Sequence, residues 1–163
     1  MRAFPAIGLL FLATACGAPA GAGDGHPCTE IGTPVGISID IAAPLADRAR
    51  AVNVTVCWAG SCQAPRVDLF PSSEAGQSGC AGEVCSAQAR PTGAKHGFAD
   101  VPGLPASPVR VTLALVSESG STFSERVLEV TPALAYPNGP DCGAGGPQAG
   151  LTVAPDGTVT QRR

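Results

Sequence analysis

The residues VRVTLAL at positions 109–115 alternate apolar side chains with polar or small ones. A period of two places neighbouring side chains on opposite faces of a β-strand, so this stretch predicts a strand with one buried and one solvent-facing side. An apolar sheet face of this kind has to be covered by a second layer. The stretch therefore favours a protein built from two packed β-sheets.

Shorter stretches with the same alternation lie on both sides of residues 109–115, and turn sequences separate them. Ser119-Gly120 and Pro155-Asp156-Gly157 are typical hairpin turns, and no stretch makes a convincing helix. We expect an all-β fold, an antiparallel β-sandwich of about seven strands with immunoglobulin-like or prealbumin-like topology. The other strands are expected at 37–41, 52–57, 67–69, 98–101, 123–130, 151–153 and from Val159 onward.

Residues 71–97 interrupt this pattern. They are rich in Ser, Gly, Ala and Gln and have no hydrophobic periodicity. We therefore expect a long loop here, within the domain.

Residues 98–115, with the turn Pro102-Gly103-Leu104-Pro105, resemble the ending of carboxypeptidase-regulatory-like and fibronectin-like sandwiches. In those proteins a Gly-Leu-Pro turn precedes a core strand. The resemblance implies that 109–115 is a core strand of a sandwich.

The composition of the 163-residue chain agrees with a strand-and-turn protein and excludes other classes. Its 21 Gly and 16 Pro residues disfavour helices. Apolar residues make up 44% of the chain, which is too many for a disordered protein. The net charge of −3 excludes a non-specific nucleic-acid binder, because such a protein needs a basic surface.

The N-terminus has the features of a secretory signal. Met1-Arg2 supplies a positive charge, residues 3–12 are almost wholly apolar, and Ala13-Thr14-Ala15 offers small residues for cleavage. An apolar run of about ten residues is too short to cross a bilayer, which takes about 20. We expect residues 1–15 to be a signal peptide and the protein to be exported.

Ala13-Thr14-Ala15-Cys16 resembles the lipobox of bacterial lipoproteins, with Ala13 where Leu is usual. The resemblance implies that Cys16 is acylated and anchors the protein on the outer face of the cell membrane. The alternative is ordinary cleavage after Ala15, which would release a soluble protein with a free thiol. Residues 16–27, rich in Gly, Ala and Pro, are expected to form a flexible tether before one domain at 28–163.

Of the 7 cysteines, assigning Cys16 to lipid leaves six, an even number that predicts three disulfides in an exported chain. Cys57 and Cys62 flank a short turn, where facing hairpin positions bring Cβ atoms to about the separation that a disulfide needs. Cys80 and Cys85 repeat this spacing. We therefore expect two local bridges.

Elimination pairs Cys28 with Cys142, which would join the two ends of the domain. In the chain-entropy model this bridge stabilises by about 4–5 kcal/mol, against about 2 kcal/mol for each local one. The two Cys-x4-Cys pairs also lie at the outer limit of zinc-site spacing. Thiols in an oxidising compartment pair with each other, so we expect no metal site.

A broader likeness runs from one end of the domain to the other. The motifs Cys28-Thr29-Glu30-Ile31-Gly32 and Pro137-Asn138-Gly139-Pro140-Asp141-Cys142-Gly143 resemble those of uncharacterised actinobacterial lipoproteins. In that group each motif tends to carry a second cysteine, and the corresponding positions here are Thr33 and Gly146. The resemblance implies an exported lipoprotein with an Ig-like or prealbumin-like sandwich and no assigned activity.

The chain carries no recognisable catalytic, metal-binding or phosphate-binding motif. His26 and His96 are expected to be solvated loop residues. A nucleophile pair of Ser78 and His96 lacks the strand-to-helix context of a hydrolase. We therefore expect no enzymatic activity and no cofactor. The carboxylates at alternate strand positions are expected to face solvent, namely Asp40, Glu125 and Glu129.

These observations predict a non-enzymatic binding or structural module of the cell envelope. We expect it to bind a protein or glycan through its loops, above all 71–97, where a Cys80–Cys85 bridge lowers the entropy cost of ordering. Trp58, beside a bridged turn, has two interpretations: a contact residue or a packing residue of the sandwich. The alternative function is a secreted protease inhibitor that presents a disulfide-clipped loop as a substrate mimic.

Overall fold

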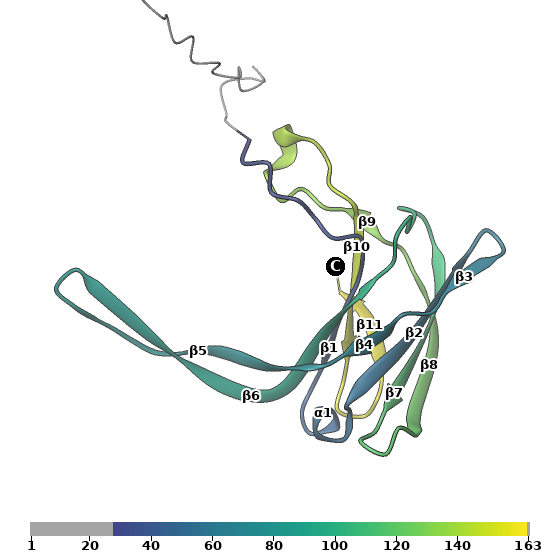
Figure 1. Ribbon diagram of the computed structural model, residues 1–163, viewed down its shortest axis with the longest axis horizontal. Helices are drawn as coiled ribbons and strands as arrows, with labels where there is room; N and C mark the ends of the chain where they lie inside the picture. The colour runs from purple at the N-terminus through teal and green to yellow at the C-terminus, as the bar shows by residue number, and fades with distance from the viewer. Residues whose placement is uncertain (1–27, 163) are drawn as a thin grey trace, which may run out of the picture.

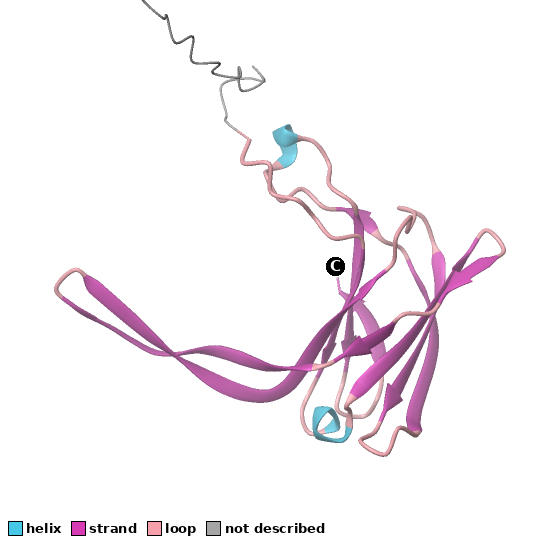
Figure 2. Ribbon diagram, in the orientation of Figure 1, coloured by secondary structure: helices cyan, strands magenta, loops and turns pink. Residues whose placement is uncertain are grey.

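The computed structural model describes residues 28–162, and most of these residues lie in strands (Figure 1, Figure 2). The predicted signal peptide 1–15, the acylation site Cys16, His26 and the predicted tether 16–27 lie outside the described residues. The expected all-β class is confirmed, since the described helices are only α1 (Leu45–Arg48) and the 3-10 turn η1 (Pro140–Cys142). Neither is long and apolar enough to span a membrane.

The strands form two sheets. The first has the order β11-β10-β1-β6-β5, with β9 beside β10, and the second has the order β3-β2-β7-β8, with β4 beside β2. The strands are β1 (Gly36–Ile41), β2 (Ala51–Trp58), β3 (Ser61–Gln63), β4 (Arg66–Asp68), β5 (Phe70–Ala81), β6 (Val84–Asp100), β7 (Val109–Val116), β8 (Thr122–Val130), β9 (Ala133–Leu134), β10 (Pro147–Val153) and β11 (Val159–Arg162).

The apolar faces of the two sheets contribute to one hydrophobic core. Alternate residues of β1, such as Ile37 and Ile39, are fully buried, and so are alternate valines of β2, such as Val54. A fully buried side chain of this size contributes roughly 1.5–3 kcal/mol relative to an exposed one. β7, the strand predicted most clearly, lies between β2 and β8. The alternation in the sequence therefore marked the strands that build this core.

Two features differ from the predicted antiparallel arrangement of about seven strands. Residues 28–162 form eleven strands, and β1 runs parallel to β10, with Ile39 opposite Leu151. The segments before β1 and β10 run side by side from the end of the molecule where Cys28 is bonded to Cys142, so both strands enter the sheet in the same direction (Figure 1). The additional strands are short or lack a buried face, so alternation does not mark them.

The expectation of a long loop at 71–97 was wrong, because this segment belongs to a hairpin of β5 and β6. Its pairing runs from Phe70 with His96 to Ala81 with Val84, and Figure 1 shows the hairpin projecting away from the two sheets. We call residues 71–94 the arm and the rest of the described chain the body. Both faces of the arm are largely exposed, so its strands need no apolar alternation, and the sequence has none.

Candidate functional site

The three predicted disulfides are present. Cys57–Cys62 joins facing residues of β2 and β3, and Cys80–Cys85 joins facing residues of β5 and β6 near the tip of the arm. Disulfides form and persist in oxidising compartments. They indicate that this domain folds outside the cytoplasm.

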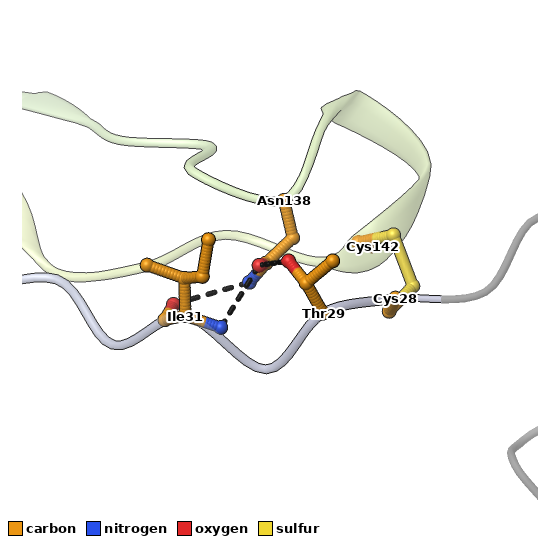
Figure 3. Close-up of a disulfide and its surroundings, with 5 residues drawn as sticks. All are labelled: Cys28, Thr29, Ile31, Asn138 and Cys142. Carbon is orange, nitrogen blue, oxygen red and sulfur yellow. Dashed lines mark hydrogen bonds between the residues drawn. A yellow bond between two sulfur atoms is a disulfide. The ribbon is translucent and has the colours of Figure 1, made fainter. Parts of the chain in front are cut away.

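The third disulfide, Cys28–Cys142, links residues 114 positions apart. Asn138 reinforces it, because its Oδ1 atom accepts hydrogen bonds from the Ile31 N–H (2.9 Å) and from the Thr29 hydroxyl (Figure 3). Its Nδ2 atom donates to the Ile31 carbonyl (3.1 Å). One amide side chain thus pairs with the opposite backbone much as a strand would. The first described residues are thereby held at a fixed point of the body.

The same end of the molecule contains Thr33 and Gly146, the two positions that the motif resemblance singled out. Thr33 lies beside Gly145, since a Cβ atom added to Gly145 would be 2.9 Å from the Thr33 Cβ atom. Gly146 instead faces Val35. The glycines let the segments before β1 and β10 approach each other closely.

Two phenylalanines lie on the solvent-facing side of the first sheet. Phe70 of β5 is 60% exposed and Phe98 of β6 is 36% exposed. The strand register places Phe70 opposite His96, and His96 opposite Asp40 of β1. Directly paired residues point to the same face, so these side chains form a row across the sheet.

A second row crosses the same face two residues along each strand. Phe98 is opposite Ser38, Ser38 is opposite Gly150 of β10, and Gly150 is opposite Arg162 of β11. The two rows bring residues from five strands onto one surface, although the chain positions they connect are as far apart as Ser38 and Arg162.

Arg162 connects the two rows. Its guanidinium forms an ion pair with Asp40 and donates a hydrogen bond to the Ser38 hydroxyl (2.6 Å). To do so it crosses β10 at Gly150, where a Cβ atom would lie 2.6 Å from the Arg162 Nε atom. The missing side chain of Gly150 therefore gives Arg162 the room to reach β1.

His96 contacts two residues of β5, Ser72 and Phe70. Its Nδ1 atom is 3.0 Å from the Ser72 hydroxyl oxygen, and the centre of its ring is 6.3 Å from that of Phe70. His96 and Phe70, together with residues of β1, β6 and β11, line a groove of about 410 Å³, a volume typical of small-molecule sites. We call it the aromatic groove, lined by Ser38, Asp40, Phe70, His96, Gly97, Phe98 and Arg162.

The sequence-predicted candidates have different positions in the structure. Trp58 is partly buried at the end of β2 and packs against the core, which supports the packing interpretation. Ser78 is paired with Ala87, which lies nine residues from His96 along β6 (87 to 96), roughly 30 Å at the rise of a strand. The structure therefore does not bring Ser78 and His96 together. The carboxylates expected to face solvent do so as exposed or partly exposed residues, namely Asp40, Glu125 and Glu129.

The aromatic groove was missed by sequence analysis. One signal was available, because His96 and Phe98 are two residues apart and therefore share a face of any strand. The remaining lining residues come from distant segments, such as Asp40 and Arg162. Alternation within one segment does not say which other strand lies beside it.

The chain matches no protein-family model, no curated protein and no solved structure. Within residues 28–162 no three His, Cys, Asp or Glu side chains are grouped as metal ligands would be. The features that bear on function are the disulfides, the aromatic groove and the arm.

Proposed function

We propose that this chain is an exported cell-envelope protein that is anchored by an acylated Cys16 on the outer face of the membrane and acts as a non-enzymatic binding module. Its two sheets then form a β-sandwich of immunoglobulin-like or prealbumin-like type. Its ligand is a protein or a glycan of the envelope, and this role requires neither a cofactor nor a nucleic acid. The observation that carries the proposal is the arm.

The arm is ordered without a hydrophobic core of its own. Its most exposed large apolar side chain is Val84, near the tip, at 73% exposure. A two-stranded hairpin is only marginally stable in water, and here the Cys80–Cys85 disulfide and an ion pair of Glu74 with Arg90 support the backbone pairing. A stiffened segment loses less conformational entropy on binding, which suits a contact surface.

The arm also carries features that keep exposed strand edges from pairing with other chains. Pro71 lies in β5 and Pro91 in β6, and proline supplies no backbone N–H. The pairing is irregular between Pro71 and Ser73 and again between Ala75 and Ser78. Irregularities of this kind twist an edge and interrupt its regular hydrogen-bonding row. These features support an arm that stays exposed until it meets its ligand.

Metabolic labelling with palmitate tests the anchor. The wild-type protein should incorporate the label and remain with the membrane, whereas Cys16→Ser should be unlabelled and released. The double variant Cys80→Ser/Cys85→Ser is the control, because it loses a disulfide and keeps the predicted acylation site. An unlabelled wild-type protein would remove the anchor from the proposal.

Photo-crosslinking in intact cells tests the binding role of the arm. A photoreactive residue at Val84 should give discrete adducts with an envelope component. The control position is Val127 on β8, which is 58% exposed on the second sheet. If Val84 gives no more adduct than Val127, the arm is not a contact surface and the proposal loses its main support.

The alternative role is that of a protease inhibitor, and its favouring observation is the bridged tip of the arm. There Ala81 pairs with Val84, so the connection between the strands is a two-residue turn at 82–83. Titration against subtilisin-like and trypsin-like proteases tests this role. Inhibition at stoichiometric amounts, lost when the tip is changed at Val84, would favour the alternative over a binding module.

A further inference from the structure

We infer that the aromatic groove is a carbohydrate-binding site for a neutral glycan chain of the cell envelope. The inference rests on the proposed role as an envelope binding module and names the ligand class of one surface of it. The arrangement of apolar and polar groups in the groove carries the inference.

The apolar part of the groove consists of the rings of Phe70 and Phe98. A sheet face that meets water normally carries polar side chains, while the apolar ones point to the core. In β6 the buried neighbour Ala99 follows this rule, and Phe98 on the opposite face does not. Exposed aromatic rings grouped in a groove mark a contact surface, because their flat faces bind apolar C–H groups. One face of a pyranose ring presents such C–H groups.

The polar part of the groove is a fixed set of hydrogen-bonding groups on the β1 side. Arg162 is held by its ion pair with Asp40 and by its hydrogen bond to Ser38. A guanidinium has five N–H donors and a carboxylate has about four acceptor positions, so both groups can form further hydrogen bonds. Sugar hydroxyls both donate and accept. A ligand with an apolar face and a rim of hydroxyls therefore matches the two halves of the groove.

The charges in the groove favour a neutral ligand. Asp40 and Arg162 are paired with each other, so neither charge is left to select an ionic partner. An apolar peptide segment lying over them would remove their water and offer few hydrogen bonds in return, which is costly for an ion pair. Sugar hydroxyls would replace those hydrogen bonds. The groove therefore favours a glycan over an apolar peptide.

A second hollow favours a chain over a single sugar. It has a volume of about 390 Å³ and shares Ser38 and Arg162 with the aromatic groove. Gln148 and Gln161 also line it, and their Nε2 atoms donate to the Pro34 and Thr131 carbonyls. Arg162 thus lies between two adjoining hollows, as expected for a surface that contacts successive sugar units.

Co-sedimentation tests this inference. The protein as isolated from cells is mixed with insoluble cell-wall glycan that has been freed of protein and lipid, and the bound fraction is measured against glycan concentration. The wild-type protein should pellet with the glycan, and neutral oligosaccharides released from that glycan should displace it. Phe70→Ala and Phe98→Ala should each weaken binding about tenfold.

The control variant is Val127→Ala, which removes an exposed apolar side chain from the second sheet and should bind like the wild-type protein. Asp40→Asn keeps the size of the side chain, removes the ion pair and should also weaken binding. Phe70 is 60% exposed, so Phe70→Ala should unfold at the wild-type temperature, which separates a binding defect from a folding defect. Phe98 is 36% exposed, so binding by Phe98→Ala is measured well below its own unfolding temperature.

A wild-type protein that stays in the supernatant would overturn the inference, and so would equal binding by the phenylalanine variants. Binding to the protein fraction of the envelope, lost in Phe70→Ala and Phe98→Ala, would also overturn it and assign the groove to a protein partner. Crosslinking through Val84 is independent of these results. If it succeeds while glycan binding fails, the envelope binding module stands and only the carbohydrate site falls.

Discussion

The arm and most of the body use the same antiparallel backbone pairing but differ in what covers it. In the body, side chains such as Ile39 and Val54 have no exposed surface. In the arm, Val84 is 73% exposed and most positions of both strands face water. The arm therefore depends on its attachment to the first sheet and on the bridge at its tip, while the body depends on burial. Strand pairing can thus shape a segment that has no core.

The two regions also differ in how their disulfides act. Cys28–Cys142 spans 114 residues of sequence and restricts the whole unfolded chain. Cys80–Cys85 spans 5 residues and restricts only the tip of the arm. We therefore expect changes in the body to alter global unfolding and changes in the arm to stay local.

Removal of the end-to-end disulfide should have the largest effect. Cys28→Ser/Cys142→Ser should lower the free energy of unfolding by about 4–5 kcal/mol, because the unfolded chain regains its freedom. Cys80→Ser/Cys85→Ser should cost at most about 2 kcal/mol and increase hydrogen exchange only in the arm. Urea denaturation and hydrogen exchange of both variants provide the measurement. Equal global losses would show that arm and body unfold as one unit.

A matched pair of valines gives the next largest difference. Val54→Ala should destabilise the body by about 2–3 kcal/mol, because it leaves a cavity in a fully buried site. Val84→Ala should change the free energy of unfolding by less than about 0.5 kcal/mol, as for other exposed sites. Denaturant titration of the two variants compares them directly. A large effect of Val84→Ala would mean that the arm is packed against something in solution.

Two glycines allow a third comparison. A Cβ atom at Gly97 would lie 2.5 Å from Val67 Cγ1 and 2.9 Å from the Asp68 carbonyl oxygen, whereas one at Gly79 would meet nothing within 4 Å. Gly97→Ala should therefore cost about 1–3 kcal/mol by overpacking, because β6 and β4 could no longer approach each other so closely. Gly79→Ala should be neutral or slightly stabilising. Thermal unfolding distinguishes the two, and similar losses would contradict the close approach at Gly97.

The smallest effect is expected at the turn between β10 and β11, where a charge is stabilised without burial. The Asp156 carboxylate accepts hydrogen bonds from the Thr158 N–H and hydroxyl, both at 2.9 Å. The backbone hydrogen bond and then the hydroxyl bond lower the pKa of Asp156 below its usual value of 3.8. Because the folded pKa is depressed, this stabilisation is present at neutral pH and is lost as the pH falls below about 3.8.

Asp156→Asn checks that pH dependence. The melting temperatures of wild type and variant should differ slightly at pH 7 and converge as the pH falls toward 2, since the wild-type carboxylate is then protonated. A difference that stays constant with pH would show that the carboxylate acts through its shape alone. The turn is exposed, so we expect a shift much smaller than that of Val54→Ala.

Much of the body could be predicted because burial leaves a mark on the sequence. Strands with one face in the core, such as β7, have alternating apolar residues, and disulfides between facing positions, such as Cys57–Cys62, have a characteristic spacing. The arm has neither a buried face nor alternation, and its equally spaced Cys80 and Cys85 were the only signal of a hairpin. The parallel pairing of β1 with β10 carried no local signal at all.

The sequence by itself determined the all-β class, the buried positions of the alternating strands and the two local disulfides, because each depends on spacing within one short segment. The pairing of Cys28 with Cys142 followed by elimination. Only the tertiary structure decided which strands are neighbours, and with them the aromatic groove. Phe70, Phe98 and Arg162 come together through hydrogen bonds between backbones. Those bonds are nearly the same for every residue type, so the side chains do not record which strands they join.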